Sequence, residues 1–356
     1  MQATKTLTIE RSSRNKKLLK PIVVHAPDPT DIVAIDIQNY VTESLSSLLP
    51  RLIPLTLSNK SLLQLAKYLK YDRSASPSSL AMYIYNIARY STRFNIEPDS
   101  LITECIDQEG TLIPKAITQA TQRLDQYYEE LKAQGLAPKT VGVWVAIVKT
   151  FYRVNKVSLP LTRKLGGRER SRDRAPTPEE LQRLVDMADL RGKVIVTMQA
   201  LGGFRRGTLS QLQYRHIKDD YEKGIIPIHI HVEAEITKGK YHDYDTFIGQ
   251  EAAEYLRAYL EIRRQGTKKI PPENIHDETP LIRNQQTKFA IPLTPAAIHK
   301  LIHDLYLKAG LIQAKPLGRR YDLRAHSIRK FFRTQMAALG VDRDYIEYMM
   351  GHTINT

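Results

Sequence analysis

Residues 200–217 read ALGGFRRGTLSQLQYRHI, and this stretch decides the fold of the C-terminal half of the chain. A Gly-Gly-Phe turn precedes a helix, because Leu209 and Leu212 have the three-residue spacing of one inward helical face. Arg205 therefore falls at the start of that helix. A guanidinium there, beside backbone N–H groups without intrahelical partners, is suited to bidentate binding of a phosphate. An Arg-Arg pair in a basic protein is more often a solvated surface feature, so the stretch alone does not define a site.

Two further motifs follow downstream. The motif AHSIRKFF places His326 and Arg329 three residues apart, on one helical face from which both side chains address the same anion. The motif MMGHT places His352 on a sharp turn that Gly351 permits. Each motif is common by itself, since most HxxR pairs belong to capped or salt-bridged helices. Their significance depends on their order along the chain.

The chain as a whole is basic. Its 356 residues include 53 Lys and Arg against 38 Asp and Glu, a net charge of +15. This excess favours a nucleic acid partner, with an anionic membrane surface as the second choice. No stretch reaches the ~18 apolar residues that span a bilayer, and no signal peptide is evident. The single cysteine, Cys105, excludes an internal disulfide and a thiolate cluster, so we expect a cytoplasmic, nucleoid-associated protein.

Apolar periodicity divides the chain into four segments. Residues 1–54 show no sustained period and are predicted to form an arm or irregular segment. Residues 55–159 hold four amphipathic stretches, which predict a small helical bundle domain. Residues 160–176 read as a basic linker. A second domain, 177–356, opens at Thr177 with a Ser/Thr-x-x-Glu capping box.

The linker carries a run of cations that we expect to lie along a DNA backbone, where a flexible cationic segment gains affinity by releasing counterions. The alternative is a merely soluble linker. Its predicted DNA-binding residues are Arg163, Lys164, Arg168, Arg170, Arg172 and Arg174.

One segment of the second domain has a clear β pattern. Residues 224–249, GIIPIHIHVEAEITKGKYHDYDTFIG, alternate β-branched and polar residues on either side of a turn around Lys238-Gly239-Lys240. His229 and His231 fall on one strand face, which we expect to face solvent. The predicted fold class is therefore mainly α, with a small antiparallel β-hairpin.

In order, these elements resemble the tyrosine recombinases, the phage-integrase class of site-specific DNA strand-exchange enzymes. In that family the first-arginine helix reads approximately G-L-R-x-x-E-L-x-x-L-x-W-x-D-I, and this chain reads G-F-R-R-G-T-L-S-Q-L-Q-Y-R-H-I from Gly203. The family's H-x-L-R-H-x-F appears as H-S-I-R-K-F-F, followed by G-H at Gly351. The resemblance covers roughly residues 60–356. It implies a helical core-binding domain followed by a mixed α/β catalytic domain.

The resemblance also implies a set of catalytic residues. Two arginines would hold the non-bridging oxygens of the scissile phosphate, and two histidines would assist proton transfer and complete the phosphate contacts. Lys238 would be the general acid for the leaving 5′-oxygen, and Lys240 is the alternative in the same turn. The expected catalytic residues are Arg205, Lys238, His326, Arg329 and His352.

Two departures from the family pattern stand out. Thr208 occupies the place of an acidic residue that usually supports the first arginine. The family's nucleophilic tyrosine lies five to nine residues after the G-H histidine, and therefore beyond Thr356, so we expect a catalytic domain that is C-terminally incomplete and inactive alone. Tyr345 and Tyr348 precede the G-H turn and are expected to be packing residues.

The implied partner is double-stranded DNA, bound by a homo-oligomer that is a tetramer on two paired sites. The implied chemistry is cleavage and rejoining of DNA through a 3′-phosphotyrosine, which needs no metal and no other cofactor. The alternatives are a catalytically disarmed DNA-binding protein on the same fold and a type IB topoisomerase. A zinc site at His299 and His303 is disfavoured, because the HExxH glutamate and a third ligand are missing.

Overall fold

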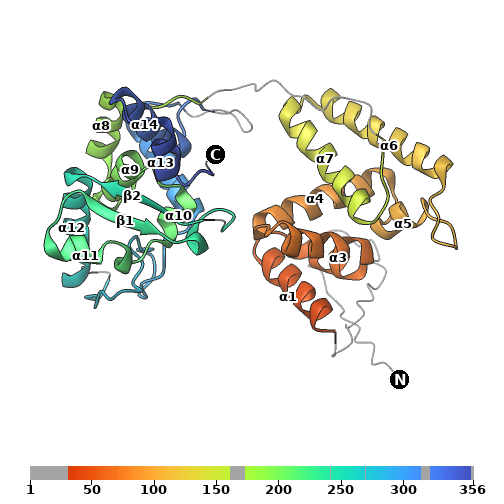
Figure 1. The fold of residues 1–356 in the computed structure, drawn as a ribbon, viewed down its shortest axis with the longest axis horizontal. Coiled ribbons are helices and arrows are strands. Elements are labelled where there is room, and N and C mark those ends of the chain that lie inside the picture. Colours follow the sequence, from red (N-terminus) through yellow and green to blue (C-terminus); the bar gives the residue numbers. More distant parts are fainter. Residues whose placement is uncertain (1–30, 161–172, 241, 269, 314–320, 354–356) are drawn as a thin grey trace. The chain divides into compact units, whose positions relative to one another are not determined.

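The computed structural model describes residues 31–160 and 173–353, apart from residues 241, 269 and 314–320. The chain divides into two compact units, Met1–Arg170 and Ser171–Thr356 (Figure 1). Each unit has its own main hydrophobic core. Helices make up most of both, and the described residues form a single two-stranded sheet. The predicted fold class is confirmed. Across these residues, no helix combines the length and apolar character needed to cross a membrane.

The first unit is a bundle of short helices that begin mostly at prolines. Pro77, Pro98, Pro114 and Pro138 each occupy a first helical position, where the missing N–H has no intrahelical partner to lose. The helices are α1 Ile32–Ser46, α2 Ile53–Ser58, α3 Lys60–Lys67, α4 Pro77–Phe94, α5 Pro98–Thr103, α6 Pro114–Ala133 and α7 Pro138–Val154.

The segment before residue 55 is more ordered than the sequence indicated. Helix α1 is capped by Asp31, whose side chain accepts a first-turn backbone N–H at 2.9 Å. It buries Ile37, Val41 and Leu45 in the core of the bundle. The prediction of an arm or irregular segment is therefore wrong for residues 32–54. These three apolar residues recur only at i, i+4 and i+8, and the segment follows two prolines. So narrow an apolar stripe did not produce a sustained helical period in the sequence. Residues 1–30 lie outside the described chain.

The second unit begins with the predicted capping box. The Thr177 side chain accepts the Glu180 backbone N–H, and the Glu180 carboxylate accepts that of Thr177. Its helices are α8 Pro178–Met187, α9 Leu190–Gly202, α10 Arg206–Gln211, α11 Lys218–Lys223, α12 Gln250–Gln265, α13 Pro295–Lys308, α14 Ala325–Ala338 and α15 Arg343–Met349.

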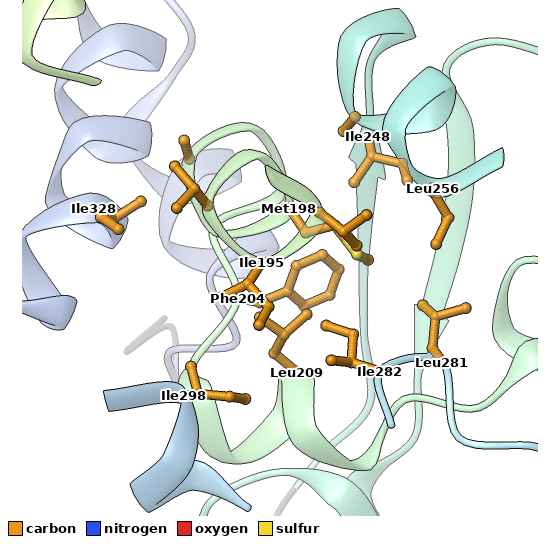
Figure 2. Packing of buried hydrophobic residues seen from close by; sticks show 14 of the residues in the cluster. Ile195, Met198, Phe204, Leu209, Ile248, Leu256, Leu281, Ile282, Ile298 and Ile328 are labelled. Atoms are coloured by element: carbon orange, nitrogen blue, oxygen red, sulfur yellow. The ribbon is translucent and has the colours of Figure 1, made fainter. Parts of the chain in front are cut away.

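Helix α9 forms the centre of this unit. Seven successive residues, 194–200, are buried, which is typical of a helix covered on every side. Figure 2 shows Ile195 and Met198 of α9 among apolar side chains from the surrounding elements. These side chains include Phe204, Leu209, Ile248, Leu256, Ile298 and Ile328.

The sheet is the predicted antiparallel pair, β1 Ile228–Val232 and β2 Tyr244–Ile248. Every second residue of β1 is buried, and His229 and His231 lie on its exposed face as expected. The connection, residues 233–243, is longer than a tight hairpin turn and contains a 3₁₀ turn at Ala234–Ile236. Gly239 and Lys240 have positive φ angles of 93° and 56°, so the chain bends at the predicted place.

Candidate active site

A pocket of about 410 Å³ in the second unit brings together four of the five predicted catalytic residues. Arg205 comes from the N-cap position of α10, His326 and Arg329 come from α14, and Lys238 comes from the connection between the strands. Lys240 is not among the residues that line it. Residues more than 120 positions apart in the sequence therefore face one space.

Arg205 is the N-cap residue of α10, as the sequence predicted. Gly203 precedes it with φ +65°, in the left-handed region, and a Cβ there would lie 2.7 Å from the Phe332 ring. Glycine is therefore required for the turn that presents the arginine. The Arg205 Nη1 donates to the carbonyls of Met350 at 3.1 Å and Gly351 at 2.7 Å. Burial lowers the pKa of the Arg205 guanidinium.

Arg329 is only 2% exposed. Its guanidinium donates to the carbonyls of Gly203 and Met350, and its Nη2 lies 3.0 Å from His352 Nε2. Burial lowers the pKa of Arg329 to about 9, and the neighbouring Arg205 cation lowers it as well. The guanidinium nevertheless remains a cation at neutral pH.

His352, the fifth predicted residue, joins the site through Arg329. Its Nδ1 contacts a carboxylate oxygen of Glu347, whose other oxygen pairs with Arg333 at 2.6 Å. These contacts fit a neutral ring that donates from Nδ1 to Glu347 and accepts from Arg329 at Nε2. Burial lowers the pKa of His352, and the Arg329 and Arg205 cations add to that effect against the raising influence of Glu347.

The two arginines form a pair of like charges, and the negative charge of Glu347 offsets that of Arg329 only in part. Both donate to the Met350 carbonyl, and no carboxylate in the described part of the chain forms an ion pair with either. Two desolvated like charges destabilise each other, as the lowered pKa of Arg329 reflects. A bound anion would relieve this repulsion, so the arrangement of the pair is suited to binding an anion.

His326 lies exposed at the pocket, on the same helix as Arg329. Partial desolvation lowers the pKa of the imidazole, Arg329 and two other cations lower it further, and Asp173 raises it. The ring is therefore largely neutral at pH 7 and able to accept a proton. Asp173 also pairs with Arg324, the N-cap residue of α14, at 2.9 Å, and with Lys330 of α14 at 2.8 Å.

The remaining sequence candidates occupy other places. Thr208 occupies the position where the family pattern has an acidic residue that supports the first arginine. Its side chain is buried beside the phenol of Tyr244. Tyr345 is 69% exposed, and Tyr348 donates its hydroxyl to Asp245 at 2.7 Å. Neither tyrosine lines the pocket.

Three other candidates, His299, His303 and Arg174, do not line the pocket. The rings of His299 and His303 stack at 6.4 Å between centroids, and no group of three potential metal ligands occurs in the described chain. Of the six linker cations only Arg174 is described, and it pairs with Glu180 at 2.6 Å and Asp322 at 3.3 Å. The others, Arg163, Lys164, Arg168, Arg170 and Arg172, lie outside the described residues.

Sequence reasoning missed the groups that hold the catalytic candidates in place. The Met350 carbonyl accepts from both arginines, and the Glu347 carboxylate contacts His352. Neither group was predicted. Glu347 lies five residues before His352, a spacing that carries no established signal. A backbone carbonyl has no signature in the sequence at all.

Among the solved structures similar to this chain are recombinases and integrases determined in complex with DNA. Lambda integrase (75–356), a dimer bound to a COC′ core site, is 14% identical, with a TM-score of 0.53 over 82% of this chain and 91% of that chain. XerH site-specific recombinase bound to difH substrate is 16% identical, with a TM-score of 0.54 over 92% and 90%. The Tn1549 transposon integrase with circular intermediate DNA is 13% identical, with a TM-score of 0.52 over 89% and 92%.

The fold is thus that of the tyrosine recombinases. The chain belongs to the phage integrase family, whose family model matches residues 176–355. A search of the curated proteins found no match.

Proposed function

We propose that this protein binds double-stranded DNA and acts in site-specific recombination by breaking and rejoining strands through a 3′-phosphotyrosine. The observation that carries this proposal is the Arg205–Arg329 pair, which shares one carbonyl and has no carboxylate partner in the described chain. A scissile phosphodiester is an anion of suitable size and charge for two guanidinium groups. Family membership and fold support the same activity.

In this proposal each pocket residue has one role. Arg205 and Arg329 bind the non-bridging oxygens and neutralise the charge that develops in the pentacoordinate transition state. His326 takes or donates a proton at the nucleophile. His352 completes the phosphate contacts when its Nε2 carries a proton; in the neutral ring, Nε2 instead accepts from Arg329 and orients that guanidinium. Lys238 gives its proton to the 5′-oxygen as the P–O bond breaks. The structure favours Lys238 over Lys240 because only Lys238 lines the pocket.

The attacking group is a tyrosine phenolate, which forms the new P–O bond while the 5′-hydroxyl leaves. Religation reverses these steps with a 5′-hydroxyl from another strand. No tyrosine among the described residues lines the pocket. Synapsis of two sites by a homo-oligomer, a tetramer in our proposal, lets strands exchange. The competing proposal is a DNA-binding protein on the same fold that does not cleave.

The first prediction separates phosphate activation from DNA binding. The probe is a duplex selected from a random library by this protein, with hydrogen peroxide supplied as an external nucleophile. Arg205→Ala and Arg329→Ala should each slow peroxide-dependent cleavage by about a hundredfold or more, while DNA affinity stays within about tenfold. Lys240→Ala serves as a control that removes a nearby exposed cation.

Two results would contradict the assignment. Equal losses of binding and cleavage in the arginine variants would make the pair a general DNA contact. Tight binding of the selected duplex without any peroxide-dependent cleavage would support the non-cleaving DNA-binding protein.

A further inference from the structure

Asp245 lies at the centre of a polar cluster outside the pocket. Its Oδ1 accepts from His229 Nε2 at 2.8 Å and from His231 Nδ1 at 3.0 Å, and its Oδ2 accepts from the Tyr348 hydroxyl at 2.7 Å. The carboxylate thus joins both strands of the sheet to α15. No role in the proposed chemistry involves any of these four side chains.

The strand register fixes the carboxylate in place. His231 is the direct cross-strand partner of Asp245, and His229 lies two residues earlier in β1 on the same exposed face. Asp243 also faces His231, at 3.5 Å. Burial raises the pKa of Asp245, but the hydrogen bonds from Tyr348, His231 and His229 outweigh it, and the net pKa is lowered. The group is an ionised acceptor, which gives a stronger hydrogen bond than a neutral one.

Tyr348 lies in the last turn of α15, next to the groups that contact both arginines and His352. On one side of it, Glu347 holds His352 through its carboxylate and through its carbonyl, which accepts the His352 backbone N–H at 2.9 Å. On the other side, the Met350 carbonyl receives both arginines. The Tyr348 carbonyl itself accepts the Gly351 backbone N–H at 2.7 Å.

Strand β2 contacts this turn at a second point. A Cβ on Gly351 would lie 2.5 Å from the Tyr244 ring, so the backbone of the turn lies directly on that ring. Tyr244 and Asp245 are adjacent in β2 and point to opposite faces of the sheet. The strand therefore contacts the turn by its inner face through packing and by its outer face through the Asp245–Tyr348 hydrogen bond.

We propose that Asp245 is a positioning residue: by binding Tyr348 it fixes the last turn of α15, and with it the Met350 carbonyl and His352. It touches no reacting atom in this scheme. The inference rests on the proposed function only where it takes the two arginines to bind a phosphate. The anchoring of the turn by Asp245 does not depend on that function.

The test is hydrogen exchange of the Gly351 and His352 backbone amides, followed in the full chain without DNA. Tyr348→Phe, which removes only the hydroxyl, should speed exchange at these amides by about tenfold relative to the rest of the second unit. The matched control is Tyr345→Phe, the same change at an exposed position of the same helix, and it should leave exchange unchanged. Asp245→Ala should match Tyr348→Phe, and Asp245→Asn, which keeps one acceptor oxygen, should restore part of the protection.

The double variant Tyr348→Phe/Asp245→Ala should exchange no faster than either single variant, because each single change already removes the Asp245–Tyr348 hydrogen bond. Additive effects, or unchanged exchange in Tyr348→Phe, would overturn the proposal. Calorimetry on the same proteins measures the binding of inorganic phosphate. The affinity for phosphate should be lower in the variants whose amides exchange faster. Faster exchange in proteins that never bind phosphate would uphold the anchoring by Asp245 and reject the phosphate site.

Discussion

His352 and His231 respond to pH in opposite directions. The pKa of His352 is lowered from its ordinary 6.5. Below pH 6.5 the unfolded chain therefore binds a proton that the folded chain does not, and the stability of the fold decreases as the pH is lowered. His352→Gln should make the loss of stability between about pH 6.5 and 5 less steep. Urea unfolding of the second unit across this range measures the slope.

His231 provides the opposing control. Its pKa is raised, chiefly by the hydrogen bond to Asp245, so its stabilising effect is complete below 6.5 and is lost as pH rises through the folded-state pKa. His231→Gln should therefore lower stability by a roughly constant amount below pH 6.5, and should make stability fall more steeply as the pH drops from the folded-state pKa of His231 to 6.5. A change of slope in the same direction for both variants would contradict the assigned protonation states.

At the scale of elements, the turn after α15 requires glycine for two reasons. Gly351 has φ +61°, and a Cβ would meet the Tyr244 ring at 2.5 Å. Gly340, after α14, has φ +78° with nothing within 4 Å of a Cβ. Gly340→Ala should therefore cost about 1 kcal/mol from backbone strain alone, and Gly351→Ala about 2 kcal/mol or more. Denaturant unfolding compares the two, and equal costs would show that the turn does not lie on Tyr244.

The sequence predicted these elements where the signal was local. A capping box marked the start of α8, alternation marked both strands, and spacing placed His326 and Arg329 on one face. Helix α1 was missed because its apolar stripe is narrow. The supports of the site were missed because they are backbone carbonyls or contacts such as Asp245–Tyr348, which join positions 103 residues apart without any periodic signal.

At the scale of the whole molecule, two separate hydrophobic cores predict two unfolding transitions. Leu65 belongs to one core and Leu256 to the other, and both are fully buried. Leu65→Ala should destabilise the first unit by about 2–5 kcal/mol and leave the second transition in place, and Leu256→Ala should do the converse. Differential scanning calorimetry of the full chain resolves the two. A joint shift of both transitions by either variant would show that the chain unfolds as a single cooperative unit.

The Met350 carbonyl receives two arginines that lie 145 and 21 residues before it in the chain. During synthesis on the ribosome both arginines emerge first, and the group that aligns them emerges later. The nascent chain therefore carries cations without an ordered anion site until residue 350 has left the exit tunnel and α15 has folded. An incomplete polypeptide would lack the carbonyl that aligns the two guanidinium groups.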